Sequence, residues 1–125
     1  MKELIIDQEF KSALPPLSKE EYDLLESQIV QDGCREALIT WNNILIDGHN
    51  RYEICNKHGF AFETDEMFFD SREDVLIWIY KNQIGKRNLT DYSRVEIALK
   101  LKETIAKKAR DRQGTRTDIK EIFPE

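Results

Sequence analysis

The stretch ILIDGHNRYEICNKHG, from Ile44 to Gly59, joins the end of a strand to the start of a helix. Three β-prone aliphatic residues stop at Asp47-Gly48, and an amphipathic run follows at once, with Gly59 as its end. Polar side chains crowd this junction, because His49, Asn50 and Arg51 follow Gly48 directly. A glycine at such a turn leaves the first N–H groups of the helix unpaired, which favours an anion site.

The residues on either side predict two further strands. Ala37–Trp41 and Ile44–Ile46 flank Asn42-Asn43, a pair that tolerates the positive φ of a tight turn, so we expect a β-hairpin. After the helix, Phe62–Phe69 predicts another strand. The hairpin therefore leads directly into the polar junction.

The N-terminal part predicts a short strand and a capped helix. Glu3–Ile6 is the expected strand, and Pro15-Pro16 imposes an extended linker after it. Ser18 with Glu21 forms a capping box, and Gly33 is the expected end of that helix.

The C-terminal part predicts two more helices. Ser71 caps the first, whose core run is Val75–Tyr80. Thr90 caps the second, which we expect to run to about Arg112 and to end at Gly114, with Thr115–Phe123 starting another helix. The expected inner face of the long helix consists of Val95, Ala98, Leu99, Leu101, Ile105 and Ala109.

This order of elements predicts an α/β (α+β) fold, a small mixed β-sheet with flanking helices followed by a C-terminal helical extension. We expect a domain over residues 1–88 and the extension over residues 89–125. The extension begins a helical pattern at its end, which suggests a helix-turn-helix beyond residue 125.

The composition is that of a globular protein, with 125 residues, 40% hydrophobic and 34% charged. No apolar run reaches the ~20 residues that span a bilayer, and acidic residues interrupt the N-terminus, so we expect a cytoplasmic protein without membrane contact. Cys34 and Cys55 have no metal-ligand spacing, which favours two reduced thiols and no metal site.

The charge is divided unevenly along the chain. Residues 1–80 hold 7 Lys/Arg against 17 Asp/Glu, whereas residues 81–116 hold 11 against 4. A basic helix on an acidic domain suits a polyanion such as DNA, but it would look the same if it paired with acidic groups of its own fold. The expected DNA-contacting residues are Arg94, Lys107, Lys108, Arg110 and Arg112.

The polar junction predicts a phosphate site. Gly48 permits close approach of a phosphate, and Arg51 offers a two-pronged donor. Asp47 and His49 have the chemistry to accept a proton. As alternatives, Asp47 would be a helix cap, Arg51 would pair with Glu53 or Glu26, and His49 would be an exposed turn residue. A second polar stretch with Asn82, Lys86 and Arg87 would close the site from the other side.

Four blocks together resemble the ParB N-terminal domain of the ParB/sulfiredoxin superfamily, over roughly residues 4–112: LLESQIVQDG, ALIT, ILIDGHNRYEIC and VLIWIYKNQIGKRNLT. The most specific piece is Gly48-x-x-Arg51, backed by Ile84, Lys86 and Leu89. The resemblance, closest to phage- and plasmid-type ParB-like proteins, implies a DNA-binding regulator or partition protein of a chromosome or mobile element. It also implies a bound nucleotide (CTP, ATP or ADP, with Mg²⁺) and a possible homodimer.

The sequence departs from this family at informative positions. His49 and Asn50 stand where the family has glutamate and arginine, so CTP specificity and hydrolysis do not carry over. Sulfiredoxins have a cysteine at the position of His49, which argues against sulfinic-acid repair. The segment DGHNR also resembles the DGHHR-like segment of free serine kinases in the superfamily. That resemblance implies an alternative function in which Asp47 is the base and Glu36 assists it.

Overall fold

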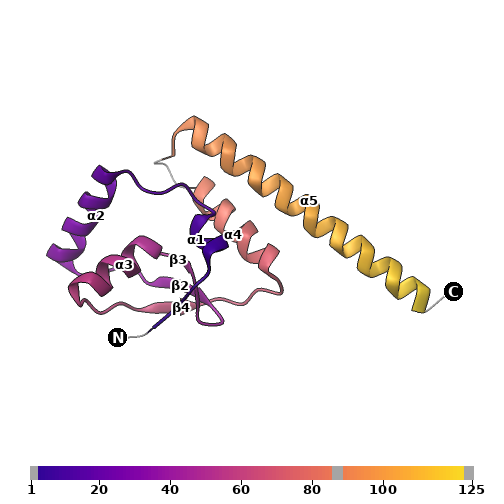
Figure 1. Ribbon diagram of the computed structural model, residues 1–125, viewed down its shortest axis with the longest axis horizontal. Coiled ribbons are helices and arrows are strands. Elements are labelled where there is room, and N and C mark those ends of the chain that lie inside the picture. The colour runs from indigo at the N-terminus through magenta and orange to yellow at the C-terminus, as the bar shows by residue number, and fades with distance from the viewer. Residues whose placement is uncertain (1–2, 86–88, 123–125) are drawn as a thin grey trace. The chain divides into compact units, whose positions relative to one another are not determined.

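The computed structural model describes residues 3–85 and 89–122, with side chains as far as residue 111 (Figure 1). The chain forms two compact units, Met1–Asp70 and Ser71–Glu125. The elements are, in chain order, β1 (Ile5–Ile6), α1 (Gln8–Ser12), α2 (Lys19–Asp32), β2 (Leu38–Trp41), β3 (Ile44–Asp47), α3 (His49–His58), β4 (Thr64–Glu66), α4 (Arg72–Ile84) and α5 (Asp91–Ile122). The predicted boundary at residue 88 stays a prediction.

The first unit contains a four-stranded mixed sheet with the strand order β1-β3-β2-β4. β3 is parallel to β1 and antiparallel to β2, and β4 adds to β2 in parallel. Asn42 and Asn43 have φ values of 51° and 65°, which confirms the predicted tight turn of the hairpin. The predicted fold class, a small mixed sheet with flanking helices, is confirmed.

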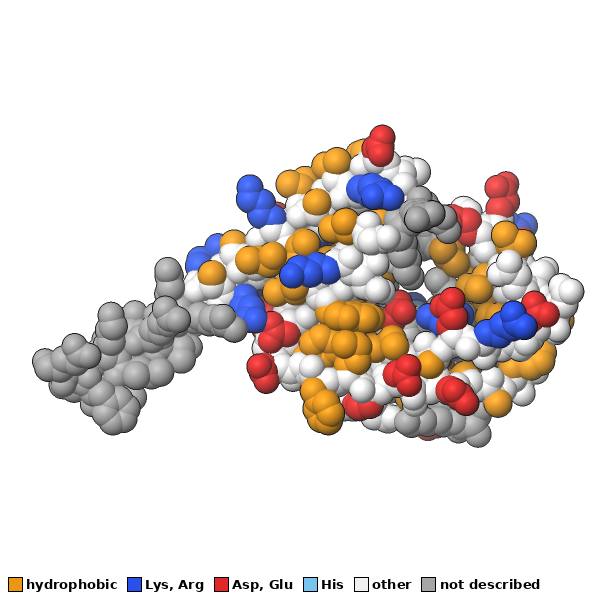
Figure 2. All heavy atoms as spheres, turned by 180° about the vertical axis from the view of Figure 1, so that it is seen from behind, with side chains coloured by type: hydrophobic (Ala, Val, Ile, Leu, Met, Phe, Trp, Pro, Cys, Tyr) orange, Lys and Arg blue, Asp and Glu red, His pale blue; other side chains and the backbone are white. Residues whose placement is uncertain are grey.

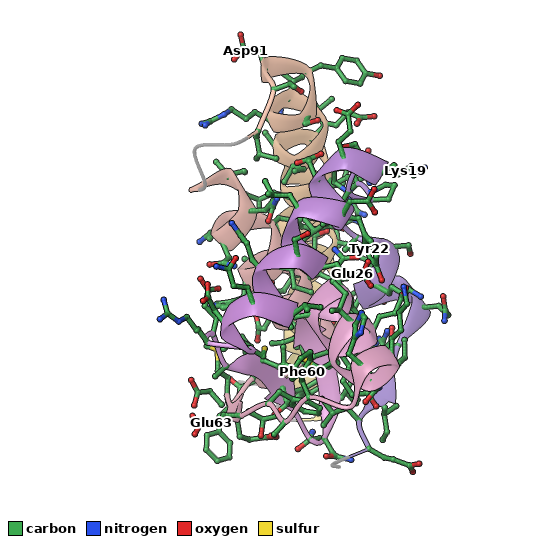
Figure 3. All side chains as sticks on the ribbon, turned by 90° about the vertical axis from the view of Figure 1, so that its left-hand side faces the viewer. Lys19, Tyr22, Glu26, Phe60, Glu63 and Asp91 are labelled. Carbon is green, nitrogen blue, oxygen red and sulfur yellow. The ribbon has the colours of Figure 1, made fainter. Side chains whose placement is uncertain are left out.

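Helices α2 and α3 lie side by side in the first unit (Figure 1). Ile29 of α2 and Ile54 and Cys55 of α3 form a buried cluster. Polar contacts close the same interface: the Tyr22 hydroxyl donates to Glu53, and Glu26 accepts from Lys57 and contacts His58. Tyr22 and Glu26 can be followed along α2 in Figure 3. This packing fixes α3, and with it the polar junction at its first turn.

Two predictions for the first unit were wrong in detail. Helix α1 was expected to be part of a linker, but Asp7 caps it by accepting from the Glu9 and Phe10 N–H groups, and Phe10 is buried. The strand expected over Phe62–Phe69 is only β4, because the ladder with β2 ends at Glu66. The capping box of Ser18 and Glu21 is confirmed.

The second unit consists of α4 and α5. The caps Ser71 and Thr90 are confirmed, since the two hydroxyls accept from the N–H groups of Asp74 and Ser93. Gly114 does not end the long helix, which continues to Ile122. One internal glycine costs a helix only about 1 kcal/mol, which the other residues of this long helix offset.

The predicted inner face of α5 was also wrong. Ile97 is buried, whereas three residues of the expected face are largely exposed: Val95, Leu99 and Ile105. Within the second unit α5 packs against α4, and apolar periodicity alone did not identify the packed side. In Figure 2, blue and orange side chains alternate over the described part of α5. No helix among the described residues is long and apolar enough to cross a membrane.

Candidate functional site

Gly48 makes the turn between β3 and α3, and its backbone is left-handed, with φ of 101°. A Cβ atom at this position would lie 2.5 Å from Leu38 Cδ2 and 3.1 Å from Arg51 Nη2. Both the backbone and the close approach of neighbours therefore require glycine. The register between β2 and β3 also shifts between Ile39 and Thr40, where Asp47 faces Ile39. Irregularities of this kind re-aim side chains at the ends of strands.

The first turn of α3 has no side-chain cap. Gly48 is the N-cap residue, so the expectation that Asp47 caps the helix was wrong. The helix begins with N–H groups that a negatively charged ligand can accept from, and the helix dipole favours negative charge at this end. The described backbone thus has the geometry that the sequence predicts for an anion site.

Arg51 folds back over Gly48 and is held by three acceptors. Its Nη1 lies 3.2 Å from a Glu36 carboxylate oxygen and 3.4 Å from the Ala37 carbonyl oxygen, and its Nη2 lies 3.3 Å from Asp47. Its side chain is 14% exposed, whereas that of Glu36 is 83% exposed. The alternative partners Glu53 and Glu26 instead bind Tyr22 and Lys57. Arg51 is therefore a fixed cation with one readily displaced partner.

His49 is not an exposed turn residue. Its Nε2 is buried without a hydrogen-bond partner among the described residues, and the ring bonds to the backbone of Leu45 through its other nitrogen. Burial lowers the pKa of His49, although the nearby carboxylates of Asp47 and Asp7 oppose this shift. The imidazole is accordingly neutral near pH 7, with a free lone pair on Nε2.

The other predicted phosphate contacts lie in different parts of the chain. Asn50 is half-buried on the first turn of α3. Asn82 lies in the last turn of α4, in the second compact unit. Lys86 and Arg87 fall outside the described residues. Closure of this second stretch onto the first stays a prediction.

Some of the basic side chains of α5 already lie beside acidic side chains of α4. Lys108 forms an ion pair with Asp74, and Lys107 lies 3.9 Å from Glu73, both acids being in the first turn of α4. Arg110 is exposed and Arg94 is half-buried. Arg112 lies within the helix, but its side chain is outside the described part. The alternative of pairing within the fold therefore holds for Lys107 and Lys108.

The residues of the junction fit a phosphate. Gly48 lets Leu38 and the Arg51 guanidinium pack close to the turn, the first turn of α3 supplies N–H donors, and Arg51 adds a guanidinium that is already oriented. Glu36 occupies the Arg51 donor that a phosphate oxygen would take. Glu36 was expected only as an assisting acid, and the Ala37 carbonyl was not expected as a partner of Arg51. Both contacts arise only when the hairpin brings residues 36–37 beside α3, which no local pattern encodes.

No family model matches the chain, and no curated protein matches it. Its fold is similar to two solved structures of pNOB8-like ParB N-domains. The first has a TM-score of 0.78 at 29% identity over 90% of this chain, and the second has 0.75 at 24% over 94%. This chain spans 46% and 44% of those two chains. The shared mixed sheet and flanking helices, together with these matches, show that the chain has a ParB N-domain-like fold.

Proposed function

We propose that this chain is the N-terminal domain of a DNA-associated, partition-type protein and that its Asp47–Arg51 segment binds a nucleotide or phosphate. The observation that carries the proposal is the uncapped first turn of α3 beside the oriented Arg51 guanidinium. Gly48 lets the Arg51 guanidinium lie close to this turn, because a Cβ there would be 3.1 Å from Nη2. When a nucleotide and Mg²⁺ are bound, the metal ion neutralises phosphate charge, and Gly48, Asn50 and Arg51 hold the phosphates.

The remaining contacts follow from the chemistry of the site. Arg51 must release Glu36 before its Nη1 can bind a phosphate oxygen, and the exposed Glu36 side chain can turn away into solvent. Asp47 stays on Nη2 and holds the guanidinium in place. This arrangement binds phosphate without requiring any group of the protein to react.

A screen of nucleotides by thermal shift tests this function. The full chain should be stabilised by at least one of CTP, ATP or ADP, with or without Mg²⁺, and Arg51→Ala should lose that stabilisation. Lys107→Ala is the matched control, because it removes a cation of the second unit that is already beside Glu73. Absence of a shift with every nucleotide would overturn the proposal.

The DNA contact is proposed for the cations of α5. Arg110 is exposed, whereas Lys108 is committed to Asp74, so the two positions should contribute differently. Arg110→Ala should lower the slope of log affinity against log salt by about 1, whereas Lys108→Ala should leave it nearly unchanged. A homodimer would present two such helices to one duplex. Equal slopes in both variants and the wild type would remove α5 from the DNA interface.

A second candidate function, a small-molecule kinase, is favoured by one observation. Glu36 and Asp47, the two carboxylates that the serine kinase resemblance implies, both contact the same Arg51 guanidinium. A kinase would make phosphoserine from serine and ADP or ATP, and Asp47→Asn would abolish it. If a nucleotide binds but no phosphoserine forms, the kinase function would be excluded and only the binding function would remain.

A further inference from the structure

The two cysteines lie together although they are far apart in the sequence. Cys34 follows Gly33, the C-cap of α2, and Cys55 is in the second half of α3. Cys34 packs against the buried cluster formed by Ile29, Ile54 and Cys55. The Cys34 thiol is also one of the groups that raise the pKa of Cys55, as expected for two thiols that lie close together. This proximity is what a disulfide between neighbouring elements requires.

The two thiols differ in access. Cys55 is fully buried, whereas Cys34 is half-buried and its Sγ contacts the Glu36 carbonyl oxygen at 3.5 Å. A solute therefore meets Cys34 first. Cys34 also lies outside regular secondary structure, after Gly33, around which a Cβ would meet nothing within 4 Å. The backbone there has room to adjust when the Sγ turns from Glu36 to Cys55.

We propose that Cys34 and Cys55 form a reversible intrachain disulfide when the chain meets a peroxide. The Cys34 thiolate attacks one oxygen of hydrogen peroxide, which gives a Cys34 sulfenic acid and hydroxide. The Cys55 sulfur then attacks the Cys34 sulfur, the S–O bond breaks, and the S–S bond forms. The Cys55 proton and the departing hydroxide leave as water. Two thiols are oxidised and one peroxide is reduced to two waters.

The surroundings explain which thiol acts first. Burial, and after it the nearby Cys34 thiol, raise the pKa of Cys55 to about 11, so Cys55 is rarely a thiolate near pH 7. Cys55 is therefore suited to resolve the sulfenic acid beside it rather than to react with solutes. Formation of the disulfide should accelerate as the pH rises.

The crosslink would join the two segments that hold the anion site. Cys34 is two residues before Glu36, and Cys55 is one helical turn after Arg51, so the bond would border the ion pair between these two residues. The inference does not rest on the proposed phosphate binding. It depends only on the packing of α2 against α3 in the first unit.

Mass spectrometry of the full chain tests the disulfide directly. Reduced protein is treated with hydrogen peroxide, denatured and alkylated with N-ethylmaleimide. The expected product carries no adduct, is about 2 Da lighter than the reduced chain, and regains two adducts after dithiothreitol. Trypsin digestion of the unreduced product should yield the peptide of residues 20–35 joined by a disulfide to that of residues 52–57, because cleavage sites separate the two cysteines.

Single variants assign the steps. Cys55→Ser should leave a sulfenic acid on Cys34 that dimedone traps, and Cys34→Ser should keep Cys55 reduced and alkylatable after denaturation. Cys55→Ala replaces Cys55→Ser if the serine variant does not fold, as judged by circular dichroism. Two adducts on the peroxide-treated wild type, or only disulfides between chains, would overturn the proposal.

Discussion

Arg51 and Lys107 of α5 are both cations beside carboxylates of their own unit, but they differ in side-chain exposure and in their distance from those carboxylates. Arg51 is 14% exposed and meets Glu36, Asp47 and the Ala37 carbonyl at 3.2–3.4 Å. Lys107 is 63% exposed and lies 3.9 Å from Glu73. A fixed guanidinium can orient a ligand, whereas an exposed lysine mainly adds to the local field. Charge counted along a sequence therefore does not measure the charge that is positioned to bind.

The largest effect is expected at Gly48, which lets Arg51 fold back. Gly48→Ala should lower the free energy of unfolding by about 2–4 kcal/mol, because it forces a left-handed alanine and a clash with the buried Leu38. Urea denaturation measures this change. Gly59→Ala is the matched control, since its φ is 74° with nothing within 4 Å, and it should cost about 1 kcal/mol. Equal losses would show that the close contact is unimportant.

The next effect contrasts the two cations directly. Arg51→Ala should lower the free energy of unfolding by about 2 kcal/mol, because Asp47 is 19% exposed and loses its charged partner. Lys107→Ala should change it by less than about 0.5 kcal/mol. Urea denaturation of both variants under one set of conditions makes the comparison. If the two losses were alike, Arg51 would be no better fixed than a surface lysine.

A smaller effect is expected from pH. Burial lowers the pKa of His49 from 6.5, so the unfolded chain takes up its proton at a higher pH than the folded chain. The stability that the neutral His49 side chain contributes is complete above its ordinary pKa of 6.5. This contribution is lost as the pH falls towards the lowered pKa of the folded chain. Unfolding free energies at pH 7.5 and 5.5 should therefore differ less in His49→Gln than in the wild type.

The matched control for this pH effect is His58→Gln. His58 lies on the last turn of α3 and contacts Glu26, so this variant keeps the buried imidazole of His49. The His58→Gln variant should therefore still lose stability between pH 7.5 and pH 5.5 because of His49. A wild-type pH dependence that survives His49→Gln would contradict the burial of this imidazole.

The smallest effect separates Lys107 from Lys108, two neighbouring lysines of α5. Lys108 is 25% exposed in its ion pair with Asp74, and Lys108→Ala should cost about 1 kcal/mol. Lys107→Ala should cost close to nothing. Repeating the denaturation in high salt should shrink the Lys108 effect, because screening weakens the pair. An unchanged effect would indicate lost packing of the lysine stem rather than lost charge.

Local signals in the sequence predicted much of the fold. The capping box of Ser18 and Glu21, the Asn42-Asn43 turn and the helix stop at Gly59 each act within a few residues, and all three are present. Helix α1 was missed although Asp7 caps it, because five residues are too few to show helical periodicity.

The site could be predicted only in part. Gly48 and Arg51 were singled out by their position after a strand, and the structure gives the turn its left-handed glycine. The alternative partners of Arg51, Glu53 and Glu26, were wrong, because Glu36 reaches Arg51 through the hairpin instead. The buried face of α5 was also wrong, since Ile97 and not Val95 packs inward. Tertiary contacts decide both cases.

The most direct test of the account is an equilibrium titration of the full chain with CTP, ATP and ADP in the presence of Mg²⁺. At least one nucleotide should bind, and Arg51→Ala should weaken it tenfold or more, which is about 1.4 kcal/mol. Glu36→Gln should tighten it by about threefold, because the competing carboxylate is exposed and its pair with Arg51 is worth less than about 1 kcal/mol. Binding that is unchanged in Arg51→Ala, or no binding by the wild type, would contradict an anion site at the first turn of α3.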